Sequence, residues 1–228
     1  MLDSTGFGPA VIDTTTHDVS FPLRTGIACG RMAITPNGLL AYLVSDTVDS
    51  GEVYDLATRK IVKSFFEPPR HLDSNVVKVL GTVHAATKGQ RIAALLNLSD
   101  TLRVFDLDGT ELFRAHIPVT PFLAPQGPLP NITSKAARQA WAEHFTLLSD
   151  LFWTDDDDIV VQSVTGSGDH VVFSLVQMST TGQRRWVLPR TPELLSIHDG
   201  RFFFHDPNSD LPNRLVVAVL KVNVASNP

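Results

Sequence analysis

The sequence predicts an all-β fold of the β-propeller class, built from four-stranded antiparallel blades. The first observation is a repeat of about 40 residues, made of short apolar segments separated by tight turns, which is typical of propeller blades. The second is a chain of 228 residues with 43% hydrophobic content, which is enough to bury a core as one domain. The four copies of the repeat are residues 31–66, 78–118, 147–190 and 194–222.

The beginning of the chain predicts a partial blade followed by a complete one. Residues 10–24 contain two short apolar segments that fit the third and outer strands of a blade. The copy at 31–66 then places the apolar run 39–44 after the turn Pro36-Asn37-Gly38, and its outer strand is expected at 60–66.

The second copy, residues 78–118, has the clearest pattern. Residues 92–96 form a nearly unbroken apolar run, which is suited to a strand buried on both faces. Asp108-Gly109 is a strong signal for a two-residue hairpin. The four antiparallel strands expected in this copy are residues 83–86, 92–96, 102–107 and 111–117.

The third copy, 147–190, repeats this pattern, whereas the fourth, 194–222, lacks a clear outer strand. Together with residues 10–24 this amounts to roughly four to five blades. A small closed ring is one possibility, with residues 19–23 completing the last copy. The favoured expectation is the C-terminal part of a propeller of about six to eight blades, because the chain starts in the middle of a repeat.

Within these repeats, one stretch resembles a known family. The segments AVIDT at 10–14 and AITPNGLLAYLV at 33–44 are similar to the YVTN-type β-propeller repeat, whose pattern runs approximately V-x-V-I-D-T-x-T and then A-V-T-P-D-G-x-x-A-Y-V. The resemblance covers about residues 10–62 and is weaker in the later copies, which keep the turns and lose the tyrosine. It implies a propeller fold and says almost nothing about activity, since propellers include binding proteins and enzymes.

An insertion at 119–146 separates the second and third copies. Its first half is rich in proline, which prevents regular strand pairing, and its second half predicts a helix at 134–145 with Ser134 as N-cap. Trp141 and His144 fall on one face of that helix. We expect the insertion to cover one face of the disc near the channel mouth, with Trp141 as a candidate for stacking on a ligand and His144 beside it.

Four further polar residues are candidates for lining the central channel. His84 and Asp150 fall in inner-strand segments, and Arg31 and Lys78 stand at the expected starts of inner strands. The functional interpretation is a polar funnel that binds a ligand. The favoured alternative is that these side chains only hydrogen-bond neighbouring blades.

The run of four aspartates at 155–158 raises the question of a Ca²⁺ site, since hard cations prefer several carboxylate oxygens. The run lacks the alternating ligand spacing of a calcium loop and stands where other copies place a simple turn. We therefore predict a solvated turn, no metal site and no cofactor.

The charge and composition of the chain argue against some classes of binding partner. The net charge of −5 and the absence of a Lys/Arg run argue against nucleic acid. No window approaches the roughly 18 apolar residues of a membrane span, and no signal peptide is visible. The expectation is a soluble protein, cytoplasmic if the chain is complete and exported if a preceding segment is missing. The single cysteine, Cys29, excludes an intramolecular disulfide.

The sequence leaves two functions open. The favoured one is a non-enzymatic binding or scaffold propeller that recognises a protein, a peptide or a carbohydrate through one face of the disc. The alternative is a propeller enzyme, a lactonase-like hydrolase or a quinone-type dehydrogenase, with its site in the central channel. No residue can be assigned a catalytic role from the sequence.

Overall fold

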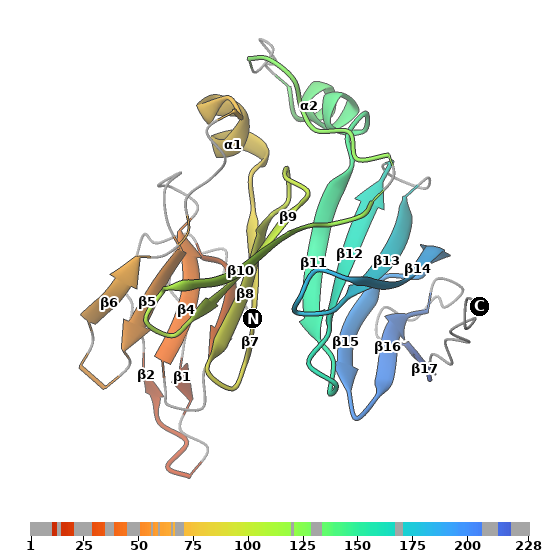
Figure 1. Ribbon diagram of the computed structural model, residues 1–228. Coiled ribbons are helices and arrows are strands. Elements are labelled where there is room, and N and C mark those ends of the chain that lie inside the picture. Colours follow the sequence, from red (N-terminus) through yellow and green to blue (C-terminus); the bar gives the residue numbers. More distant parts are fainter. Residues whose placement is uncertain are drawn as a thin grey trace.

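The computed structural model consists of antiparallel sheets that follow one another in chain order across the molecule (Figure 1). It describes residues 11–12, 15–20, 29–34, 39–44, 51–55, 57–58, 60–64, 66, 71–119, 121–128, 134–166, 171–206 and 214–219. The turn Pro36-Asn37-Gly38 lies outside these residues. Successive inner strands contact one another, so the sheets are arranged side by side as blades.

The first half of the chain forms a hairpin and two blades. The hairpin pairs Ile12 with Val19, as expected for the partial blade at 10–24. The hairpin strands are β1 (Val11–Ile12) and β2 (Val19–Ser20). Blade 1 contains β3 (Cys29–Ile34), β4 (Leu39–Val44), β5 (Gly51–Asp55) and β6 (Lys60–Ser64). Blade 2 contains β7 (Val83–Lys88), β8 (Arg91–Leu96), β9 (Thr101–Asp106) and β10 (Glu111–His116).

The second half forms blades 3 and 4. Blade 4 has three strands among the described residues, and residues 220–222 of the fourth copy lie outside them. Blade 3 contains β11 (Leu147–Trp153), β12 (Ile159–Thr165), β13 (Val172–Met178) and β14 (Arg184–Thr191). Blade 4 contains β15 (Leu194–His198), β16 (Arg201–His205) and β17 (Leu215–Ala218).

The hydrophobic core lies between the blades. Leu95 of blade 2 and Val161 of blade 3 belong to one buried cluster, which joins these two blades. The next cluster joins Val160 of blade 3 to Phe202 and Phe204 of blade 4. Consecutive side chains of a strand alternate between the two faces of a blade, and both faces are covered here, so β8 is apolar from Ile92 to Leu96 and β12 is apolar from Ile159 to Val161.

A helix that the sequence analysis missed precedes blade 2. Helix α1 (Ser74–Leu80) begins at Asp73, whose carboxylate accepts hydrogen bonds from the backbone N–H groups of Asn75 and Val76 at 2.9 and 3.1 Å. The prediction that Lys78 starts an inner strand is therefore wrong. The β-branched valines of this segment favour a strand, but the N-cap and the burial of Val76 in the core favour the helix.

The predicted insertion helix is present. Helix α2 (Lys135–Ala142) has Ser134 at its start, where the hydroxyl accepts a hydrogen bond from the N–H of Ala137 at 3.1 Å. Both helices lie at the same end of the blades in Figure 1. Neither of the helices that the structure describes has the length and apolar character needed to cross a membrane.

Candidate functional site

Two of the predicted channel residues meet across the boundary between blades 2 and 3. His84 on β7 and Asp150 on β11 place Nδ1 and Oδ1 3.9 Å apart, and both side chains are buried. Asp150 Oδ1 also accepts a hydrogen bond from the N–H of Leu151 at 2.9 Å. The distance between Nδ1 and Oδ1 is longer than a hydrogen bond, so the structure places a buried imidazole and a buried carboxylate beside each other at the boundary between two inner strands.

The other two channel candidates, Arg31 and Lys78, lie on elements other than β7 and β11, which carry this pair. Arg31 lies in β3, the inner strand of blade 1, and Lys78 lies in α1 rather than in an inner strand. The orientations of these two side chains lie outside the described part of the structure. The predicted four-residue funnel is thus reduced to the pair His84–Asp150.

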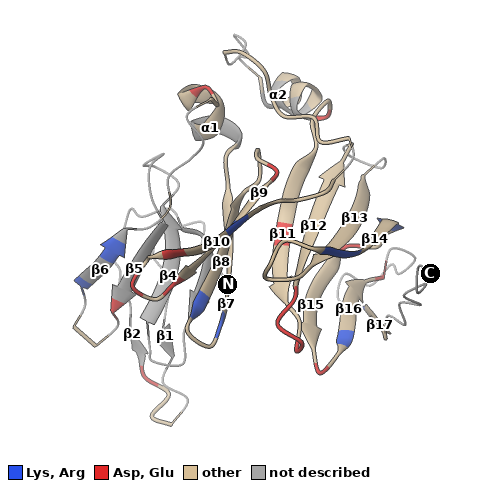
Figure 2. Cartoon of the chain, in the orientation of Figure 1, with Lys and Arg blue, Asp and Glu red and all other residues tan. Residues whose placement is uncertain are grey.

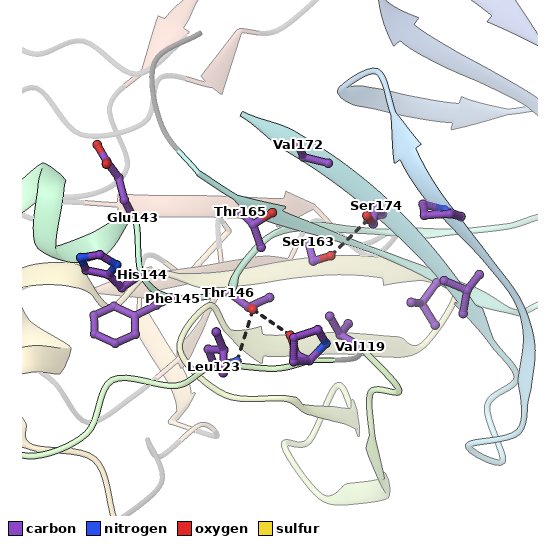
Figure 3. Close-up of a pocket in the computed structure, with 14 residues that line it drawn as sticks. Val119, Leu123, Glu143, His144, Phe145, Thr146, Ser163, Thr165, Val172 and Ser174 are labelled. Atoms are coloured by element: carbon purple, nitrogen blue, oxygen red, sulfur yellow. Dashed lines mark hydrogen bonds between the residues drawn. The ribbon is translucent and has the colours of Figure 1, made fainter. Parts of the chain in front are cut away.

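A pocket of about 360 Å³ lies at the end of blade 3 that carries α2 (Figure 3). One wall is the face of blade 3 that elsewhere packs against blade 2. Along β12 this face carries Ile159 and Val161 in the core, then Ser163 and Thr165 in the pocket. The change from branched aliphatic to hydroxyl side chains occurs where blade 2 no longer covers blade 3.

Another wall is formed by two parts of the insertion, namely Val119, Pro121 and Leu123 in the first and residues 143–146 in the second. The pocket is lined by Val119, Pro121, Leu123, Glu143, His144, Phe145, Thr146, Ser163, Thr165, Val172, Ser174, Val176, Val187 and Pro189. Most of these side chains are apolar, and four carry hydroxyl groups. Figure 3 shows the Glu143 carboxylate pointing away from the other labelled residues, so the interior of the pocket is mainly apolar with hydroxyl groups.

Thr146 fixes the insertion wall. Its buried hydroxyl donates to the carbonyl of Pro121 at 3.0 Å and accepts from the N–H of Leu123 at 3.2 Å, as the dashed lines in Figure 3 show. Its own N–H donates to the carbonyl of Leu123 at 3.0 Å. These three bonds tie the segment that follows β10 to the segment that precedes β11, so the pocket has a defined wall rather than a loose loop.

The two insertion candidates from the sequence have different positions. His144 lines the pocket and is exposed. Trp141 is half-buried, packs against the core between α1 and blade 2, and makes an edge contact with Phe145 at a ring-centroid distance of 5.0 Å. Trp141 supports the insertion in this arrangement, and its ring is not among the lining residues of the pocket.

The acidic turn at 155–158 contacts blade 2 instead of being only solvated. Asp157 forms ion pairs with Lys88 at 2.7 Å and with Arg91 at 2.9 Å, the last residue of β7 and the first residue of β8. Figure 2 shows acidic residues at the lower end of β11 and basic residues at the lower ends of β7 and β8. Hydrogen bonds from Lys88 and Arg91, in that order of effect, lower the pKa of Asp157 below its ordinary value of 3.8.

The last aspartate of the turn also forms side-chain hydrogen bonds. Asp158 accepts hydrogen bonds from the side chains of Gln177 at 2.7 Å and Arg185 at 3.2 Å. No group of three His, Cys, Asp or Glu side chains suited to a metal ion occurs among the residues that the structure describes. The turn is best explained as a contact between blades 2 and 3.

Most of the pocket was not predicted from the sequence. The lining residues of β13 and β14, among them Ser174 and Val187, belong to ordinary strands and carry no motif. One usable signal was the change of residue type along one face of β12, from Ile159 and Val161 to Ser163 and Thr165. This change marks the point along β12 at which the side chains on this face are no longer part of the hydrophobic core. It does not show which segment covers them.

The chain matches no protein-family model and no curated protein. Among solved structures it is similar to hydrazine synthase of Kuenenia stuttgartiensis, with 12% identity and a TM-score of 0.55 over 92% of this chain and 53% of that chain. TolB from Acinetobacter baumannii has 12% identity and a TM-score of 0.45, covering 85% and 44% of the two chains. The Dos1 propeller has 11% identity and a TM-score of 0.44, covering 95% and 54%.

The chain thus spans about half the length of hydrazine synthase. At 12% identity this similarity shows the fold alone. Consecutive antiparallel blades, cores between them, and this similarity together establish that the chain has the β-propeller fold.

Proposed function

We propose that this chain is a non-enzymatic binding module that recognises a protein or peptide through the end of the blades covered by the insertion. The observation that carries the proposal is the pocket between blade 3 and the insertion, which contributes Val119, Pro121, Leu123 and residues 143–146. Its volume of about 360 Å³ is in the range of ligand pockets, and it accommodates one large side chain. The YVTN-type assignment of residues 10–62 remains a prediction from the sequence and is compatible with this role.

The chemistry of the lining favours an uncharged apolar group over a carbohydrate. Val172, Val187 and Leu123 are partly exposed on the pocket walls, and an apolar ligand would remove them from water. A sugar needs several converging polar groups and a flat aromatic surface. The lining contains no Asp, Asn, Gln or Trp, and its aromatic ring, Phe145, is engaged with Trp141. Of the three ligand classes expected from the sequence, the lining therefore favours peptides and proteins.

The alternative is a propeller enzyme with its site in the channel, and the pair His84–Asp150 is the observation in its favour. A buried His beside a carboxylate is a common acid–base arrangement. However, both residues are enclosed, and Asp150 is oriented by a backbone N–H group. A stoichiometric divalent metal in the purified protein would favour the enzyme, as would loss of a later-found activity in His84→Ala and Asp150→Ala.

The binding proposal can be tested by NMR on protein with ¹³C-labelled valine methyl groups. The probes are N-acetyl-phenylalanine amide, N-acetyl-leucine amide and methyl glucoside. We expect the two amides to shift the signals of the lining valines and the glucoside to leave them unchanged. The reporters are Val119, Val172, Val176 and Val187.

A matched pair of variants locates the binding. Val172→Trp fills the pocket and should abolish the shifts, whereas Val171→Trp changes a neighbouring residue of equal exposure outside the pocket and should preserve them. If only the glucoside shifts these signals, the ligand class is a carbohydrate, and the proposal of a peptide ligand is wrong. Amide binding that persists in Val172→Trp would place the site elsewhere and contradict the proposal.

A further inference from the structure

The wall of the pocket that blade 3 forms carries two neighbouring serine side chains. Ser163 on β12 pairs in register with Ser174 on β13, and Ser174 pairs with Pro189 on β14. All three residues line the pocket. Because directly paired residues of neighbouring antiparallel strands lie on the same face of a sheet, these side chains form one row across the wall, and two of the three are hydroxyls.

The rows on either side of this serine row are largely apolar. Val176, which belongs to the core between blades 2 and 3, pairs with Val187 on one side. Thr165 pairs with Val172 on the other side. These four residues also line the pocket. A group that fills the pocket therefore meets apolar side chains on both sides of a central pair of hydroxyls.

The two serines differ in burial and in hydrogen bonding. Ser163 is 3% exposed, and its hydroxyl donates to the backbone carbonyl of Ser174 in a long hydrogen bond of 3.4 Å (Figure 3). A hydroxyl that donates its hydrogen to the protein presents its lone pairs to a ligand, so Ser163 is suited to accept a hydrogen bond. Ser174 is only partly buried, and its hydroxyl can rotate to donate or to accept. The pair can thus serve both the hydrogen and the oxygen of one ligand hydroxyl.

We propose that the pocket binds the side chain of a tyrosine presented by a partner protein or peptide, and that Ser163 and Ser174 determine this specificity. The inference rests on the proposed function, because it specifies which side chain the binding module takes. The ring of a tyrosine matches the apolar rows, and its hydroxyl can donate to Ser163 while it accepts from Ser174.

The other side-chain types each leave part of this wall unmatched. Phenylalanine and leucine cover the serine row with apolar atoms, so the hydroxyls lose water without gaining a partner. Serine and threonine supply a hydroxyl but are too small to cover the valines of both rows. A charged side chain would lose its hydration without a buried opposite charge, because the ionisable residues of the lining, Glu143 and His144, are exposed.

Titration of three amides into the valine-labelled protein tests the preference. N-acetyl-tyrosine amide should bind about threefold to tenfold more tightly than N-acetyl-phenylalanine amide, which is the effect of one net hydrogen bond. N-acetyl-O-methyltyrosine amide keeps the ring and the oxygen but cannot donate, so it should bind no more tightly than the phenylalanine amide. Equal affinities for tyrosine and phenylalanine would overturn the tyrosine proposal alone. If none of the three amides shifts the lining valines, the proposed function fails and this inference fails with it.

Matched serine variants show whether this wall causes the preference. Ser163→Ala and Ser174→Ala should each bring the affinity ratio of tyrosine to phenylalanine toward one, while continued binding of the phenylalanine amide shows that the pocket is intact. Ser149→Ala is the control, because its hydroxyl also donates to a backbone carbonyl of blade 3 at 3.4 Å, that of Gln162, and does not line the pocket. A preference that persists in both pocket variants, or that Ser149→Ala also removes, would overturn the assignment to Ser163 and Ser174.

Discussion

Leu95 and Val161 show how single side chains between blades contribute to the stability of this protein. Both are fully buried in the cluster that joins blades 2 and 3. Leu95 lies in the apolar run 92–96, which was expected to be buried on both faces, and Val161 lies in the corresponding run of the third copy, residues 159–161; both runs are buried in the structure. A side chain in such a cluster contacts two sheets at once, so its removal weakens the contact between them.

We predict that Leu95→Ala lowers the free energy of unfolding by about 2–4 kcal/mol and Val161→Ala by about 1–3 kcal/mol, because each leaves a cavity that two rigid sheets cannot close. Leu112→Ala, at an exposed position of β10, should change it by less than about 0.5 kcal/mol. Urea denaturation measures all three. Equal losses at Leu95 and Leu112 would refute the assignment of the core.

At the scale of elements, the turn between β11 and β12 contacts blade 2 through Asp157. This residue has a positive φ of 64° and forms ion pairs with Lys88 and Arg91. The sequence showed four adjacent aspartates and predicted a solvated turn. It could not show which of them meets a basic turn, because that depends on how two neighbouring sheets are oriented.

We predict that Asp157→Asn destabilises the protein by roughly 0.5–1 kcal/mol at pH 7, since the ion pairs are partly exposed to solvent. Asparagine tolerates positive φ, so the backbone should not be strained. The folded pKa of Asp157 lies below 3.8, so its stabilisation is complete above that value and is lost as the pH falls through the folded pKa. The difference between wild type and variant should therefore vanish in acid.

Urea titrations between neutral pH and about pH 3 provide the measurement. Asp156→Asn is the control, because Asp156 is exposed and makes no ion pair that the structure describes; it should change the stability by less than about 0.5 kcal/mol. A difference between wild type and Asp157→Asn that stays constant down to low pH would show that charge is not the cause.

At the scale of the whole molecule, blades 2 and 3 each have neighbours on both faces, whereas β17 is open to solvent. Blade 4 is connected to blade 3 partly through Gln162, whose buried amide accepts from the N–H of Leu194 at 2.6 Å and donates to its carbonyl at 3.4 Å. Contacts of this kind determine whether the last blade opens by itself.

We predict that backbone amides of β17 exchange with solvent much faster than those of β8 and β12. Gln162→Ala leaves two buried backbone groups of Leu194 without partners, at a cost of about 1–3 kcal/mol. It should accelerate exchange in β15 and β16 and leave β8 unchanged. Gln177→Ala is the control, because Gln177 bonds within blade 3. Uniform acceleration across all blades would show that blade 4 does not open separately.

The sequence determined the elements that depend on neighbouring residues. Turn residues, apolar runs and the Ser134 cap predicted strands of the blades and helix α2, because these patterns act within a hairpin or a helical turn. The exception is α1, because Lys78 was expected at the start of an inner strand and lies instead in a helix that Asp73 caps. Local signals of opposite sign cannot be weighed without the packing around them.

Only the tertiary structure decided which residues form the sites. It brought His84 to Asp150, directed Asp157 toward Lys88, placed Trp141 against the core and formed the pocket over Ser163 and Ser174. Each of these contacts joins segments that belong to different blades or to a blade and the insertion. Their formation depends on the angles and separations between sheets, and the periodicity of a single strand carries no information about either.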